Sequence, residues 1–163
     1  IIRRIQHIVP YYFSHGSFFV IFVHKNNTFY KSMITHDLRV IADAILDKKG
    51  ENVVSIDLRP IGTAITDFFV ICEGSSTTNV AAITDNIVKE VREQLGLKPS
   101  RMQGMENNFW VILDYGNIVV HVFQKEYRDF YHLEDLWADA PHKTYKERKK
   151  VAKKTNEQGS EEE

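Results

Sequence analysis

The chain has 163 residues, of which 43% are hydrophobic and 26% charged, and its formal net charge is −1. This length suits one domain with tails, and the proportions are those of an ordinary folded protein, which excludes collagen-like, fibrous and wholly disordered classes. The near-zero net charge excludes a global field that would attract nucleic acid or an anionic membrane, so charge has to be judged segment by segment.

Residues 1–33 differ in composition from the rest of the chain. No acidic residue precedes Asp37, while basic and aromatic side chains are frequent. An acid-poor, basic leader is typical of organellar import, although this one is only weakly amphipathic. The alternative is that Met33 is the true start and that the residues before it are a non-native extension. The longest apolar run, Phe18–Val23, is far shorter than the roughly 20 residues of a membrane helix, so a soluble protein is expected.

Helical spacing and strand alternation define the next elements. Thr35 is expected to cap a helix whose apolar stripe stops before Gly50. Residues 52–58 alternate as a strand with one polar side, and residues 67–72 form a continuous apolar run that suits a central strand buried on both faces. Cys72 lies in that run and is expected to be buried. As the single cysteine it excludes an intrachain disulfide and is consistent with a reducing compartment.

A second helix, a hairpin and a last helix follow. The second helix is bounded by Ser75 or Ser76 as its cap and by Gly96 as its stop. The hairpin consists of strands 109–114 and 117–123, joined by a turn at Tyr115-Gly116. The last helix covers the aromatic stretch 125–137. A strand, a crossover helix and a further strand pack with a right-handed connection, so the central strand and the hairpin should share one sheet.

The order α-β-β-α-β-β-α predicts one α/β (α+β) domain over residues 34–140, in which helices pack on a small mixed sheet. Residues 141–163 are rich in Lys and Glu and carry almost no apolar side chains. Such a segment cannot offset its chain entropy by burial, so it is predicted to be a charged, disordered tail. Its basic half is a candidate for weak contact with RNA phosphates.

A catalytic alternative rests on the junction between the central strand and the second helix. Gly74-Ser75, between a buried strand and a helix, is an arrangement that receives phosphate at a helix N-terminus in nucleotidyltransferases. That chemistry also needs two or three carboxylates to hold magnesium. Downstream the chain offers Asp85, but its neighbours at two-residue spacing are Ile83 and Ile87, and no carboxylate pair follows on a strand. The histidines are scattered and no glycine-rich phosphate loop is present. No catalytic residue, metal, cofactor or small-molecule substrate is therefore predicted, and an enzyme using Ser75 and Asp85 stays the rival hypothesis.

Large aromatic side chains remain, near the ends of the hairpin and in the last helix. Phe109, Val111 and Phe130 are expected in the core. For Trp110, Tyr131 and Trp137 a core position and an interface role both stay open. The interface hypothesis rests on Trp and Tyr near Arg128, because these residue types dominate binding hot spots. His121 is expected to be a hydrogen-bonded structural residue and Asp114 a turn acceptor.

Four motifs occur in order along the core: Thr66–Cys72 with Gly74-Ser75-Ser76, Trp110–Gly116, His121–Phe123, and Arg128–Tyr131 with Leu133–Trp137. Together they resemble the ribosomal silencing factor family, also called RsfS or iojap, over about residues 37–139. One departure is Gln103-Gly104, where the family usually has Glu-Gly. This change removes a charge and puts in doubt any salt bridge made there.

The resemblance implies a nucleotidyltransferase-like fold without the active site, and thus a protein that is not an enzyme. It implies binding to ribosomal protein L-fourteen on the large subunit, steric blocking of subunit joining and repression of translation when nutrients are short. Organellar relatives act in large-subunit assembly, and members can form dimers. The expected location is cytoplasmic, or an organelle if residues 1–33 are a transit peptide. The residues expected to bind the partner are Trp110, Asp114, Tyr115, His121, Arg128, Tyr131, Glu134 and Trp137.

Overall fold

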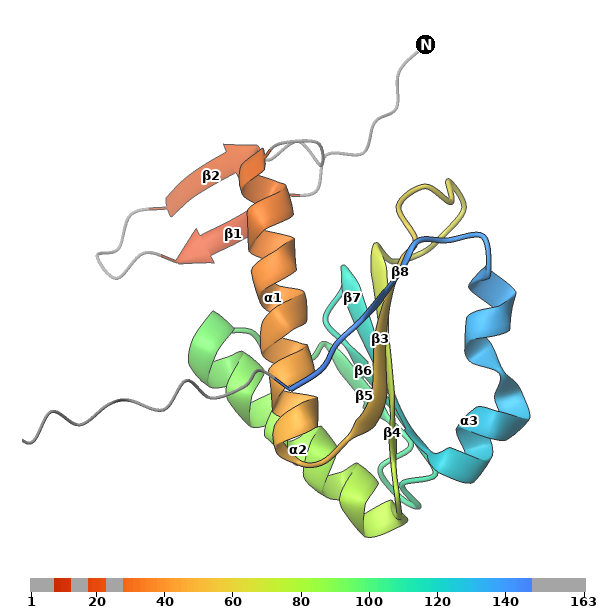
Figure 1. Cartoon of the computed structure of the whole chain (residues 1–163). Helices are drawn as coiled ribbons and strands as arrows, with labels where there is room; N and C mark the ends of the chain where they lie inside the picture. Colours follow the sequence, from red (N-terminus) through yellow and green to blue (C-terminus); the bar gives the residue numbers. More distant parts are fainter. Residues whose placement is uncertain (1–7, 13–17, 23–27, 148–163) are drawn as a thin grey trace, which may run out of the picture.

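A six-stranded sheet with helical segments on both faces forms the main body of the protein (Figure 1). The computed structural model describes residues 8–12, 18–22 and 28–147. The elements are β1 (Ile8–Tyr12), β2 (Phe18–Phe22), α1 (Thr28–Asp47), β3 (Glu51–Asp57), β4 (Phe68–Gly74), α2 (Thr77–Leu95), β5 (Arg101–Gln103), β6 (Trp110–Asp114), β7 (Ile118–Gln124), α3 (Lys125–Tyr131), the 3-10 helix η1 (Leu133–Trp137) and β8 (His142–Thr144). None of the helices in these described stretches is long and apolar enough to cross a membrane.

The sheet is mixed, with the strand order β5-β6-β7-β4-β3-β8. β4 pairs in parallel with β7 across the α2 crossover, and the other neighbours are antiparallel. The predicted central strand and hairpin are confirmed, because β4 lies between β7 and β3 and β6 pairs with β7. α1 and α2 cover one face, and α3 with η1 covers the other (Figure 1). The predicted fold class, a small mixed sheet packed by helices, is confirmed.

The face covered by α1 and α2 holds the larger part of the core. Its helical contributions follow the predicted stripes and include Leu38, Ile41, Ile45, Val80, Ile83, Ile87 and Val91, all buried. Burial of each such side chain contributes about 1.5–3 kcal/mol before entropy is subtracted. The ends of α2 are as predicted. Ser76 Oγ accepts from the Asn79 N–H at 3.2 Å, and Gly96 adopts a left-handed conformation with φ of 69°.

The first helix begins earlier than the sequence indicated. α1 starts at Thr28, and Thr35 lies inside it, where its hydroxyl donates to the Lys31 carbonyl at 2.7 Å instead of capping the helix. Tyr30 is buried and donates to the Asp67 carboxylate at 2.8 Å. The start of α1 and the buried Tyr30 therefore lie within the residues assigned to the leader. The other parts of the expected leader, residues 1–7, 13–17 and 23–27, lie outside the described residues, so its nature stays a prediction.

β3 is buried on both faces, which corrects the expectation of one polar side. Val53 packs into the core under α1 and α2, whereas Ile56 packs under α3 and η1. The short strands β5 and β8 were not predicted, because three residues carry too little alternation to detect. β8 lies inside the expected tail, and the buried Tyr145 after it shares a hydrogen bond of 3.0 Å with the Ser55 hydroxyl. Only residues 148–163 of that tail lie outside the described chain.

The predicted last helix is broken at His132, which has a left-handed φ of 45° between α3 and η1. In the seven-residue α3 the buried residue is Arg128. Two aromatic assignments to the core are wrong, one in α3 and one just before β6. Phe130 is 76% exposed and Phe109 is 36% exposed, although both were expected in the core. Val111, also assigned to the core, is fully buried as predicted.

Two glycines near β6 both have a left-handed backbone, but a side chain would meet neighbouring atoms at only one of them. Replacing each by alanine therefore separates backbone strain from steric contact. Gly104 and Gly116 have φ of 80° and 84°, respectively. A Cβ on Gly104 would lie 1.9 Å from the Trp110 carbonyl oxygen, whereas nothing lies within 4 Å at Gly116. We expect Gly116→Ala to lower the free energy of unfolding by about 1 kcal/mol through backbone strain, and Gly104→Ala by about 2–4 kcal/mol. Urea denaturation measures both, and equal losses would contradict the close contact.

Candidate docking surface

Aromatic side chains from the sheet and from the α3–η1 segment pack together on the face opposite α1 and α2. The ring centroids are 4.7 Å apart for Phe69 and His121, and 5.9 Å apart for Phe69 and Trp137, both edge to face. The Trp110 and Tyr131 rings lie 5.1 Å apart. We call these five residues the aromatic layer. Tilted and edge-to-face contacts favour a defined geometry, so the layer limits how the segment sits on the sheet.

His121 is the buried polar member of the aromatic layer. The Trp110 indole N–H donates to His121 Nδ1 at 3.2 Å across the β6–β7 pair, which confirms the prediction of a hydrogen-bonded structural histidine. With Nδ1 accepting, the neutral ring carries its proton on Nε2, a buried atom without a partner among the described residues. Burial lowers the pKa of His121 to about 4, against the opposing charge of Glu134. The ring is therefore neutral at pH 7.

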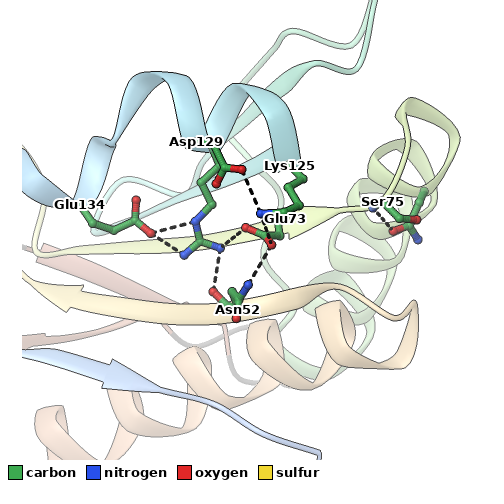
Figure 2. A network of polar contacts seen from close by, with 8 residues as sticks. Asn52, Glu73, Ser75, Lys125, Asp129 and Glu134 are labelled. Atoms are coloured by element: carbon green, nitrogen blue, oxygen red, sulfur yellow. Dashed lines mark hydrogen bonds and ion pairs between the residues drawn. The ribbon is translucent and has the colours of Figure 1, made fainter.

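A buried arginine, Arg128, connects α3 with the sheet and with η1. The residues bonded to it, Asn52, Glu73 and Glu134, are labelled in Figure 2. Arg128 Nη1 donates to Glu73 Oε2 at 3.1 Å and to the Asn52 carbonyl at 2.9 Å. Its Nε donates to the Glu134 carboxylate at 2.9 Å, and Nη2 donates to the same oxygen. Glu73 also accepts from the Asn52 side chain at 2.8 Å. We call these four residues the arginine clamp. Arg128 is 9% exposed and Glu73 4%, so their charges are satisfied inside the protein.

The outer side of α3 and η1 exposes large apolar side chains. Phe130 is 76% exposed, Leu136 73% and Tyr131 49%, and we call these three the exposed patch. Phe130 and Tyr131 are in edge-to-face contact at 5.1 Å, and Tyr131 continues inward to Trp110. Exposed rings on a packed aromatic base are typical of surfaces that bind protein partners.

Six of the eight residues expected to bind a partner come together here: Trp110, His121, Arg128, Tyr131, Glu134 and Trp137. Of these, Tyr131 is the exposed one. His121 and Arg128 are buried, and Glu134 is partly buried with one carboxylate oxygen bonded to Arg128. His121 and Arg128 therefore lie underneath the surface rather than on it.

Asp114 and Tyr115 lie elsewhere. Asp114 is at the far end of β6 from Trp110, about 13 Å away at the usual strand rise. Its carboxylate accepts from the Gly116 N–H at 2.7 Å, which confirms the predicted turn acceptor. Tyr115 packs against the core under α1 and α2, and burial raises its pKa to about 12. The eight residues therefore do not form one surface: six gather around the aromatic layer and the arginine clamp, and Asp114 and Tyr115 lie apart from them. That any of them binds a partner stays a prediction.

The sequence interpretation missed two partners of Arg128, Glu73 and Asn52, and most of the exposed patch. Glu73 lies just beyond the predicted strand 67–72, but it continues β4 and is buried. A charged residue directly after a long apolar run was the available signal, because such a position needs a cation nearby. Nothing local indicated Asn52, which has a left-handed φ of 47°. It contributes its carbonyl oxygen to Arg128 and its side-chain amide to Glu73. Phe130 and Leu136 required knowing where the last helix breaks.

The residues of the catalytic alternative do not converge. Ser75 is exposed before α2, and its backbone N–H donates to the Asn79 side chain at 3.1 Å. Asp85 is exposed eight residues into α2 from Thr77, about 12 Å along the helix at 1.5 Å rise per residue. Among the described residues, no group of three or more His, Cys, Asp or Glu side chains is placed to hold a metal. Cys72 is buried as predicted, and burial raises its pKa to about 12, which leaves it unreactive at neutral pH.

Comparison with known proteins gives consistent results. The family model described as "Ribosomal silencing factor during starvation" matches residues 31–163. A ribosomal silencing factor RsfS from Halalkalibacterium halodurans is 44% identical over 104 residues, which cover 64% of this chain and 87% of that protein. A crystal structure from Bacillus halodurans, 39% identical, superposes with a TM-score of 0.58 over 67% of this chain and 97% of that one. The mouse "Mitochondrial assembly of ribosomal large subunit protein 1" is 27% identical over 104 residues, covering 62% of this chain and 45% of that protein.

The buried His121 gives the stability a predictable dependence on pH. Its pKa is about 4 in the folded protein and near 6.5 when exposed, so the unfolded chain binds more protons between these values. Stability should therefore fall as pH falls, by about 2 kcal/mol between pH 7 and pH 4.5. Urea denaturation across this range measures it. His121→Gln keeps an acceptor for Trp110 but does not titrate, so its stability should vary less. Equal pH dependence in both proteins would exclude His121 as the cause.

Proposed function

The chain belongs to the ribosomal silencing factor family, and from this premise we propose that it docks on the large ribosomal subunit and lowers translation without catalysing a reaction. The finer proposal is that it binds ribosomal protein L-fourteen and prevents the small subunit from joining when nutrients are short. The observation that carries the proposal is the exposed patch on α3 and η1, which presents apolar side chains to solvent above a packed aromatic layer.

The surface has the two properties that a docking site needs. Tyr131 and Phe130 offer apolar area that would lose contact with water on binding, which favours association. Beneath them, Trp110 is fixed by its hydrogen bond to His121 and by stacking on Phe123 at 4.7 Å. A side chain that is already ordered loses little entropy on binding, so more of the contact energy appears as affinity.

Steric exclusion needs only a stable complex. An interface of standard size buries roughly 1,600 Å² in total, an area that a domain of this size can supply from one face. The bound domain would then occupy space that the second ribosomal subunit requires. No turnover, metal or nucleotide enters this mechanism, which agrees with the separation of Ser75 from Asp85.

A role in assembling the large subunit is the second candidate, and the name of the mouse relative favours it. The same docking surface would serve both roles, so variants of the surface do not distinguish them. Sucrose-gradient sedimentation does. A silencing factor should accompany mature free large subunits, whereas an assembly factor should accompany immature particles.

Truncation of the aromatic rings tests the docking surface. Trp110→Ala and Tyr131→Ala should each weaken binding to large subunits by about 2 kcal/mol, because each removes an anchor from the centre of the proposed interface. Leu97→Ala is the control, since Leu97 is 44% exposed and follows α2 on the opposite face. Pull-down with purified large subunits measures binding after circular dichroism confirms folding. Retention of full affinity by both ring variants would remove this surface from the proposal.

Deletion of residues 148–163 tests the predicted RNA contact of the tail. The cut follows Glu147 because β8 and Tyr145 belong to the folded domain. We expect the truncated chain to bind large subunits modestly less tightly than the full chain at low salt. The difference should disappear at high salt, because salt screens contacts between lysines and phosphates. Pull-down at two salt concentrations measures this. Complete loss of binding at high salt as well would show that the tail, rather than the exposed patch, is the principal contact.

A further inference from the structure

The segment that carries the exposed patch has very little apolar anchorage. Arg128 is the buried residue that α3 contributes among the described residues, and η1 contributes none. Tyr127, Leu133 and Trp137 pack only partly buried against the sheet. A segment with few buried apolar contacts opens locally at low free energy unless something else restrains it. The ring contacts of the aromatic layer limit how the segment sits, but with so little fully buried apolar area a second restraint is needed to fix α3 and η1.

The arginine clamp provides this restraint, because one guanidinium joins three other elements to α3. Arg128 reaches β3 through the Asn52 carbonyl at 2.9 Å and β4 through Glu73 at 3.1 Å. It also reaches η1 through Glu134 at 2.9 Å. The planar guanidinium holds its donors in a fixed arrangement, so these bonds define an orientation as well as a distance.

The position of Glu134 determines what the clamp controls. Trp137 follows Glu134 by three residues in η1 and rests edge to face on Phe69. On the other side of the His132 break, Tyr131 follows Arg128 by three residues in α3 and contacts Trp110. The Arg128–Glu134 bond spans that break. It therefore ties the two halves of the segment to each other as well as to the sheet.

We propose that Arg128 is a positioning residue, which holds α3 and η1 on the sheet through Glu73 and Glu134 so that the exposed patch forms one docking surface. The consequence for binding rests on the proposed function, whereas the structural role does not. Arg128 and Glu134 thereby become internal supports instead of the partner contacts that the sequence indicated.

Arg128→Met is the direct test, because it removes the charge and keeps an unbranched side chain. The full chain has two tryptophans, so labelling with fluorotryptophan gives two fluorine resonances, which Trp110→Phe assigns. We expect the Trp137 resonance to move and broaden, thermal unfolding to stay cooperative, and affinity for large subunits to fall about tenfold or more. Arg92→Met removes an equal charge from an exposed position on α2 and should change neither readout.

Glu134→Gln provides a second variant if Arg128→Met does not fold, because it weakens the bond to η1 and leaves Arg128 paired with Glu73. Unchanged binding in the folded variant would overturn the positioning role. Weakened binding with an unchanged Trp137 resonance would also overturn it, since Arg128 would then contact the partner directly. A wild-type chain that does not bind large subunits would overturn the proposed function instead. In that case the Trp137 resonance alone decides whether the clamp holds η1.

Discussion

The ion pairs of Arg128 with Glu73 and Glu134 hold the second layer of this protein in place. A sheet that is apolar on both faces must be covered on both, and here the two coverings differ in kind. α1 and α2 bury long apolar stripes, whereas α3 and η1 are short and expose several of their apolar side chains. A desolvated ion pair is costly unless its hydrogen bonds are satisfied, and the bonds to Asn52 and both carboxylates meet that condition.

This division separates stability from recognition. Because the larger core lies under α1 and α2, the opposite side can direct Phe130, Tyr131 and Leu136 outward without removing the main source of folding energy. The aromatic layer then connects that patch to the sheet through Trp110 and His121. The aromatic layer beneath the exposed patch is therefore already ordered before a partner binds.

Much of the fold was predictable, because the α2 crossover and the strands around it follow local rules. The run ending at Cys72 and the stripe from Val80 to Val91 are periodic within one element, and each reports burial directly. The candidate site was only partly predictable. Trp110 and Tyr131 were recognisable by residue type, but the pairing of Arg128 with Glu73 joins positions 55 residues apart, which no local pattern records. The break at His132 has no glycine or proline to announce it, so the exposure of Phe130 could not be foreseen.

The same ion pairs explain why the proposed mechanism includes no binding of a nucleotide phosphate. In a phosphate-binding site of this topology, the end of the central strand and the start of the next helix would need groups that attract an anion. Here that strand end carries the Glu73 carboxylate, and the nearby guanidinium of Arg128 is bound to two carboxylates. The Lys125 ammonium lies 3.9 Å from the Glu73 carboxylate and donates to the Asp129 carboxylate at 2.9 Å. Arg128 and Lys125 are therefore both paired with carboxylates of the protein itself. At this end of the sheet these cations hold α3 in place and are not free to bind a phosphate.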